Sequence, residues 1–178
     1  MLWRRLLPIG IASLFALLGI ACGGGGSDGG GGGTNTWVGK VEGSDAYIAM
    51  LIEGTARYVY VTDGKEMSLL FRGNIGETDE LSYFTLRDDQ NRVINVQAPT
   101  GRVFKGLLTV SEGRHLPFTA APATEEAGLY RAKAGSGESR WIVLEDGSFR
   151  GATDDGDGTL QSLTTLGGEK WSDPTTDP

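Results

Sequence analysis

Short apolar runs alternate with turn residues along most of the chain after residue 36. The runs are rich in β-branched and aromatic residues, and clusters of Gly, Asp, Asn and Pro interrupt them about every 10 to 13 residues. Strands at this spacing are typical of a β-sandwich or a β-barrel. The pattern predicts nine strands, at residues 46–52, 57–62, 67–71, 81–86, 93–96, 103–110, 116–120, 128–132 and 141–144.

The alternation inside these runs predicts which faces are buried. In 57–62, Tyr58 and Tyr60 fall on one face and two valines on the other. Runs 46–52 and 140–144 are apolar on both faces, which indicates strands covered on both sides. We therefore expect an all-β domain, an antiparallel meander that forms a small barrel or a barrel-like sandwich.

Three glycine-containing turns mark hairpins within this pattern. Asp63-Gly64 and Asp146-Gly147 have the composition of two-residue turns, which need positive φ at both central positions. Glu53-Gly54-Thr55 predicts another tight reversal.

The first 21 residues have the layout of an export signal. Arg4 and Arg5 precede an uncharged apolar run at 6–20. This run is about 15 residues long, shorter than the ~20 needed to span a bilayer. The sequence therefore predicts a secretory leader.

The end of the leader, Gly19-Ile20-Ala21-Cys22, resembles the lipobox of bacterial lipoproteins, although leucine is commoner where Gly19 stands. The resemblance implies that Cys22, the single cysteine, receives a diacylglyceryl thioether and becomes the acylated N-terminus. It implies a cell-envelope location with the membrane as partner. Gly23, where an aspartate would favour inner-membrane retention, implies the outer membrane in a Gram-negative cell. In a Gram-positive cell the anchor implies the extracytoplasmic face of the plasma membrane.

Composition divides the chain into four parts. After Cys22, residues 23–33 are nine glycines, one serine and one aspartate, a composition that favours disorder because ordering glycine costs the most backbone entropy. The polar C-terminal end also favours disorder. The expected parts are a signal peptide (1–21), a lipidated cysteine with a Gly-rich tether (22–35), a β domain (36–153) and an acidic, mostly disordered tail (154–178).

The body is also similar to an uncharacterised all-β domain of secreted and lipid-anchored bacterial proteins. The resemblance implies a domain boundary and no activity. The matching stretches are 38–39, 46–49, 71–73, 126–132, 141–147 and 150–152.

The charge of the chain narrows the possible partners. Its formal net charge is −7, and loss of Arg4 and Arg5 with the leader makes it −9. Nucleic-acid binding needs a basic surface, so we expect no nucleic-acid partner. Binding to anionic lipid through surface charge is disfavoured for the same reason.

An aromatic-cation-glycine pattern recurs at Phe71-Arg72-Gly73, Phe104-Lys105-Gly106 and Phe149-Arg150-Gly151. The three cations either grip an anion together or point to water at bends of a closing sheet, where strand glycines are expected.

The loop 153–159 is the best metal candidate, because Asp155 and Asp157 stand among glycines, and oxygen-rich, glycine-bent loops suit calcium. The loop lacks the first and twelfth carboxylates of an EF-hand. The alternative is a flexible acidic loop without metal.

No catalytic residue is predicted. His115 is the single histidine, and no serine has the surroundings of a nucleophile elbow. The paired carboxylates (79–80, 88–89, 125–126, 145–146) stand at predicted turns. We expect a non-enzymatic binding or structural module that needs no cofactor beyond the lipid. One alternative is a barrel that carries an apolar ligand between Tyr58, Tyr60 and Trp141. The second is an envelope hydrolase that uses carboxylates.

Overall fold

The computed structural model describes residues 35–75, 83–100, 102–111, 113–124, 126–134, 137–155 and 159–171. These residues form thirteen β-strands and no helix, which confirms the predicted all-β class. Accordingly, the described part of the chain holds no helix long and apolar enough to cross a membrane. The leader, Cys22 and the glycine tract lie outside the described residues.

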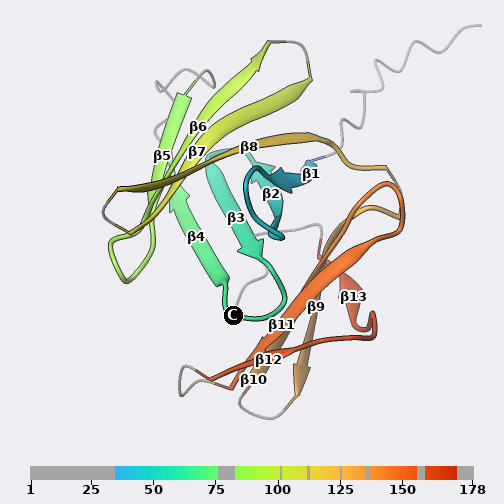
Figure 1. Cartoon of the computed structure of the whole chain (residues 1–178). Coiled ribbons are helices and arrows are strands. Elements are labelled where there is room, and N and C mark those ends of the chain that lie inside the picture. Colours follow the sequence, from blue (N-terminus) through green and yellow to red (C-terminus); the bar gives the residue numbers. More distant parts are fainter. Residues whose placement is uncertain are drawn as a thin grey trace, which may run out of the picture. The chain divides into compact units, whose positions relative to one another are not determined.

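The first eight strands form one antiparallel sheet. They are β1 (Thr36–Val41), β2 (Tyr47–Glu53), β3 (Ala56–Thr62), β4 (Ser68–Asn74), β5 (Tyr83–Arg87), β6 (Val93–Thr100), β7 (Val103–Ser111) and β8 (Arg114–Pro122). Their order in the sheet is β4-β3-β2-β1-β8-β7-β6-β5 (Figure 1). The β1–β8 ladder therefore joins the two ends of the meander, as in an up-and-down barrel.

The sheet is open between β4 and β5, since no ladder joins them among the described residues. Side chains cover this seam. A Cβ at Gly73 of β4 would lie 3.0 Å from the Leu86 side chain of β5. Close by, the Arg57 guanidinium lies 5.9 Å from the centre of the Phe84 ring. The predicted meander is thus a nearly closed barrel.

Apolar side chains from all eight strands fill the barrel interior. Inward-pointing residues alternate along each strand, and eight strands leave an interior just wide enough for side chains to fill. Phe118 is among the largest of these buried side chains. Its ring fits because residue 106 opposite it is glycine: a Cβ at Gly106 would lie 2.3 Å from the Phe118 ring. The inward set includes Ile48, Met50, Val59, Val61, Phe71, Phe84, Ile94, Leu108 and Phe118.

The remaining strands form a second antiparallel sheet. They are β9 (Gly128–Ala134), β10 (Gly137–Val143), β11 (Phe149–Asp154), β12 (Leu160–Ser162) and β13 (Glu169–Lys170). The order β12-β11-β10-β9-β13 places β10 in the middle, as its apolar faces predict (Figure 1).

A second core joins this sheet to the outer face of β1–β3. From the barrel side it takes Tyr47, Ala49 and Leu51 of β2, and from the second sheet it takes, among others, Leu129 and Ile142. Strand β2 is therefore buried on both faces, as predicted from its sequence.

Two of the predicted turns differ from the structure. Asp63-Gly64 and Asp146-Gly147 lie in five-residue connections, 63–67 and 144–148, and only the glycine of each pair has positive φ. The two-residue hairpin prediction is therefore wrong for both. The tight reversal at Gly54 is confirmed: Glu53 pairs with Ala56, and Gly54 has φ 53°.

The C-terminal end also differs from expectation. Residues 159–171 contribute β12 and β13 instead of a loose tail, and Asp154 ends β11. Trp171 contributes to holding this end on the domain, because it is 2% exposed and packs in the second core. Strands β1 and β11 were not among the nine predicted, because glycines interrupt their apolar patterns.

Candidate functional site

A polar cleft of about 510 Å³ lies where β4, the β5–β6 turn and the second sheet meet. Four arginines line it: Arg72, Arg87, Arg92 and Arg140. We call this hollow the arginine cleft. It brings four guanidinium groups together on a chain whose formal net charge is −7.

Strand β4 forms one wall because its side chains alternate. Leu69 and Phe71 point into the barrel, so Ser68, Leu70 and Arg72 lie on the outer face. This alternation follows directly from the sequence of the strand.

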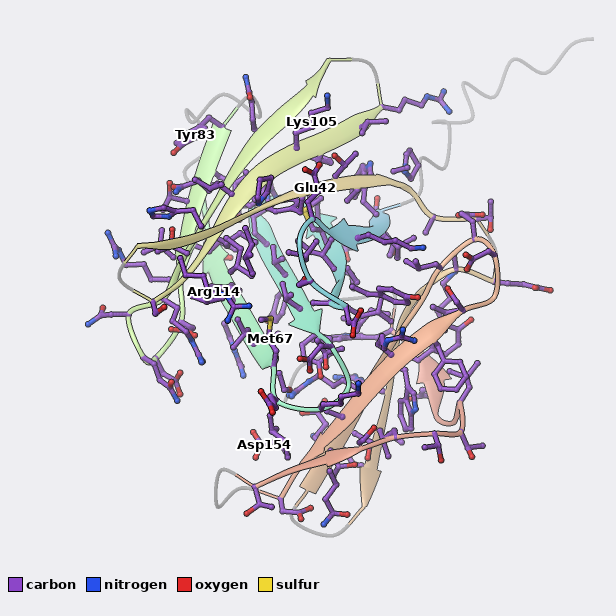
Figure 2. All side chains as sticks on the ribbon, viewed as in Figure 1. Glu42, Met67, Tyr83, Lys105, Arg114 and Asp154 are labelled. Carbon is purple, nitrogen blue, oxygen red and sulfur yellow. The ribbon has the colours of Figure 1, made fainter. Side chains whose placement is uncertain are left out.

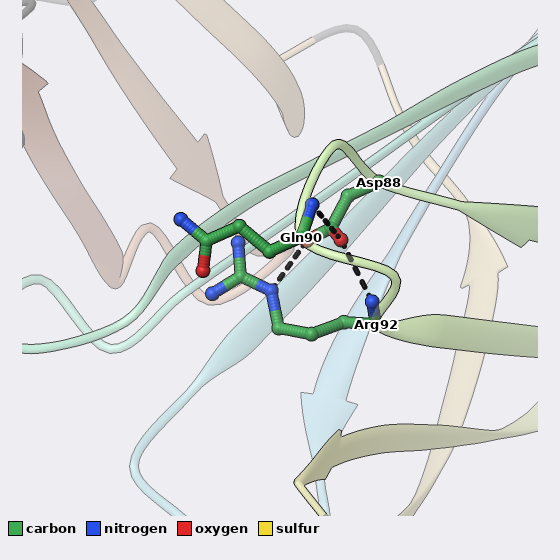
Figure 3. Close-up of polar contacts among 3 residues, drawn as sticks. All are labelled: Asp88, Gln90 and Arg92. Carbon is green, nitrogen blue, oxygen red and sulfur yellow. Dashed lines mark hydrogen bonds and ion pairs between the residues drawn. The ribbon is translucent and has the colours of Figure 1, made fainter.

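The β5–β6 turn forms the second wall, and Asp88 holds its shape (Figure 3). The Asp88 side chain is 1% exposed. Its Oδ1 accepts hydrogen bonds from the backbone N–H of Gln90 (3.0 Å) and Arg92 (2.8 Å), and its Oδ2 pairs with Nε of Arg92. Asn91 takes the left-handed conformation that the turn needs, with φ 61°. Asp88 is therefore fully committed to fixing the turn and orienting Arg92.

Arg140 of β10 forms the third wall. It lies on the same face of β10 as Ile142, toward the barrel, with its Cζ 5.8 Å from the centre of the Tyr60 ring. One of its terminal nitrogens pairs with Glu138, whereas its buried Nε has no partner. Tyr60 is fully buried, and its hydroxyl lies 3.0 Å from Ser68 Oγ. Burial raises the pKa of Tyr60, so this phenol stays neutral and the charge in this wall is that of Arg140.

Guanidinium N–H groups of Arg87 and Arg92 have no acceptor among the residues that the structure describes. Arg87 is exposed and makes no hydrogen bond or ion pair within the described part of the chain. Arg92 uses its Nε and backbone N–H for Asp88, which leaves its terminal nitrogens available. Asp89 and Asp154 also line the cleft, so its net charge is small. The arrangement offers fork-shaped donors suited to one oxyanion group.

A second hollow, of about 490 Å³, lies between the 63–67 and 144–148 connections. Asp63 organises one side of it: its Oδ1 accepts hydrogen bonds from the backbone N–H of Lys65, Glu66 and Met67 at 2.8–2.9 Å. Burial acts to raise the pKa of Asp63, but these three donors outweigh it, and the pKa lies below its usual value. The Asp63 carboxylate therefore stabilises the conformation of the 63–67 connection.

We expect Asp63→Asn to destabilise the domain by about 1 kcal/mol at pH 7, because a neutral oxygen is a weaker acceptor for three N–H groups. Because the pKa of Asp63 is lowered in the folded domain, its carboxylate stabilises the fold fully above about pH 4. This stabilisation is lost as the pH falls through the pKa that Asp63 has in the folded state. Urea unfolding at pH 7 and at pH 2.5 measures the difference between the variant and the wild type. An equal difference at both pH values would contradict the role of the charge.

The three residues predicted to hold an apolar ligand do not line one cavity. Tyr58 packs edge-on against Trp171, with ring centres 5.2 Å apart, and Tyr60 lies under Arg140. Trp141 lies on the other face of β10, where its Nε1 donates to the carbonyl of Thr165 at 2.8 Å. All three are used for packing.

The three cations of the aromatic-cation-glycine pattern are not brought together either. Arg72 lines the arginine cleft, and Arg150 lies 4.8 Å from the centre of the Tyr47 ring beside the second hollow. Lys105 lines neither hollow, and Figure 2 shows it at the opposite end of the view from Asp154. Two of the three glycines of the pattern instead admit aromatic rings: a Cβ at Gly106 would lie 2.3 Å from Phe118, and a Cβ at Gly151 would lie 2.5 Å from Trp141.

The other candidate groups serve local structure. His115 is exposed, and its Nδ1 lies 3.0 Å from Thr109 Oγ1 across the β7–β8 ladder. Glu145 accepts two hydrogen bonds from Thr124, both at 2.7 Å. Carboxylates 79–80 and Glu125 lie outside the described residues.

Of the two residues predicted to bind calcium, the structure describes only one. Asp155 is exposed and accepts a hydrogen bond from Gln161 at 2.7 Å. Asp157 lies outside the described residues. Among the residues that are described, no group of three or more His, Cys, Asp or Glu side chains is placed to hold a metal ion.

Comparisons with protein families, with curated proteins and with solved structures find no match. What the arginine cleft can bind is therefore inferred from its geometry alone. Sequence reasoning singled out Arg72 and missed Arg87, Arg92 and Arg140 as partners. Its walls come from residues 68–72, 87–92 and 140–154, which are separate segments of the chain, and no local motif links them.

Proposed function

We propose that this chain is a lipid-anchored cell-envelope protein whose β domain acts as a non-enzymatic binding module. The anchor rests on the lipobox-like sequence ending at Cys22, the single cysteine. Lipid on this residue, together with Gly23 after it, favours the outer membrane in a Gram-negative cell. In a Gram-positive cell it favours the outer face of the plasma membrane.

The observation that supports the binding role is the contrast between the filled interior of the barrel and the arginine cleft on its outer face. Apolar side chains of the described residues fill the barrel interior, so carriage of an apolar ligand inside it has little support. The arginine cleft is lined by guanidinium groups, and those of Arg87 and Arg92 have donors without an acceptor among the described residues. Binding on this outer cleft therefore has better support than carriage inside the barrel.

Catalysis by paired carboxylates has less support. Glycoside hydrolysis needs two carboxyl groups facing each other across a substrate. Asp88 is occupied by its own turn, and Glu145 is bound to Thr124. The proposal therefore assigns no catalytic group.

Metabolic labelling with a palmitate analogue tests the anchor. We expect the wild type to take up label and Cys22→Ala to take up none, because no other cysteine can accept the thioether. Immunoblots for the chain in membrane and soluble fractions control for expression. Label that persists in Cys22→Ala would refute the proposal.

A further inference from the structure

We infer that the arginine cleft binds a small molecule through one oxyanion group, a phosphate or a carboxylate. This inference deepens the proposed binding role by giving the chemical class of ligand. It does not depend on the lipid anchor.

The first support is the state of the arginine donors. Guanidinium groups normally find acceptors, and charge-assisted forks to carboxylate or phosphate are their strongest bonds. Here Arg87 has no partner within the described chain, and the terminal nitrogens of Arg92 have none either. These donors come from the two ends of one short turn, which Asp88 holds fixed.

The second support is the burial of Arg140. Its side chain is only 12% exposed, and its Nε is buried without an acceptor. Removing part of a charge from water is costly unless an opposite charge compensates. Glu138 compensates one terminal nitrogen, and an anion in the cleft would add a second acceptor near the same guanidinium.

The size and the acidic lining of the cleft limit the ligand. About 510 Å³ falls in the range of small-molecule sites, roughly 300–1,000 Å³. Asp89 and Asp154 also line the cleft and would repel a ligand with several negative charges. One oxyanion on a larger, otherwise uncharged or zwitterionic body fits this balance.

The test is a titration of the purified full chain with the phosphate monoanion, at mildly acidic pH, and, separately, with acetate, at constant ionic strength. Amide NMR shifts of residues 87–92 and Arg140 report binding. Saturable shifts with phosphate alone identify a phosphate ligand, with acetate alone a carboxylate ligand, and with both a general oxyanion site. No saturable shift with either probe overturns the inference.

Variants decide whether the cleft is responsible. We expect Arg87→Ala to weaken binding about 10-fold and Arg87→Lys to restore only part of it, because lysine keeps the charge but loses the fork. Arg87 is exposed, so the variant should fold. The matched control is Lys105→Ala, which removes an exposed strand cation outside the cleft and should leave binding unchanged. Equal weakening by both alanine variants would show nonspecific charge attraction and overturn the inference. Because Cys22 labelling is measured separately, failure of either test leaves the other result interpretable.

Discussion

Replacing Gly39 with valine is expected to prevent the β domain from folding, or to destabilise it by more than about 4 kcal/mol. A Cβ at Gly39 would lie 1.8 Å from the carbonyl oxygen of Thr119. That atom is backbone of β8, so relief requires β1 and β8 to separate. This ladder joins the ends of the meander, and a domain of this size has only about 5–15 kcal/mol to lose.

Far-UV circular dichroism and urea unfolding of the purified variant measure this effect. Lys40→Val is the control, because Lys40 is the next residue on β1 and its side chain is exposed. It should change stability by about 0.5 kcal/mol or less. A Gly39→Val protein with the wild-type unfolding midpoint would mean that the close approach of β1 to β8 is not formed.

Trp171→Ala should lower the free energy of unfolding by about 3–5 kcal/mol, as expected for truncation of a buried aromatic residue. The indole is 2% exposed and packs edge-on against Tyr58. The Arg131 guanidinium lies 4.6 Å from the centre of the Trp171 ring. The backbone N–H of Trp171 donates a hydrogen bond to the Leu129 carbonyl at 2.8 Å. Its loss would open a cavity between the barrel and the second sheet.

Thermal and urea unfolding again give the measurement. Leu166→Ala is the matched control, because it truncates an apolar residue of the same segment that is 42% exposed. We expect a loss of less than about 1 kcal/mol for Leu166→Ala. If residues after 154 were the loose tail that their composition suggests, neither variant would change the midpoint.

The fold class was predictable because local rules act on every strand of the barrel. Tyr58 and Tyr60 alternate with two valines, and the structure places the tyrosines outside and the valines inside the barrel. The two-sided burial of β2 was visible in the same way. The five-residue loop at Asp63 was not, because Asp-Gly fits two turn types and the choice depends on hydrogen bonds from the next three residues.

The second sheet and the cleft were harder to predict for a different reason. Trp171 stands in a polar, acidic segment, and it is a core residue because of partners far away in the chain, among them Tyr58, more than 100 residues earlier. The same holds for Arg140: its sequence neighbours indicate a central strand, and its place in one cleft with Arg92 depends on how the two sheets pack. Single-sequence patterns carry periodicity but not such long-range neighbours.

Strand β2 has a consequence for how the domain loses its structure. Ile48 and Met50 belong to the barrel core, whereas Ala49 and Leu51 belong to the core shared with the second sheet. Detaching the second sheet would expose an apolar stripe along a central barrel strand, and disrupting the barrel would remove the surface on which the second sheet rests. Neither layer is an independent module, so the two should melt together in one cooperative transition and be inherited together as one unit.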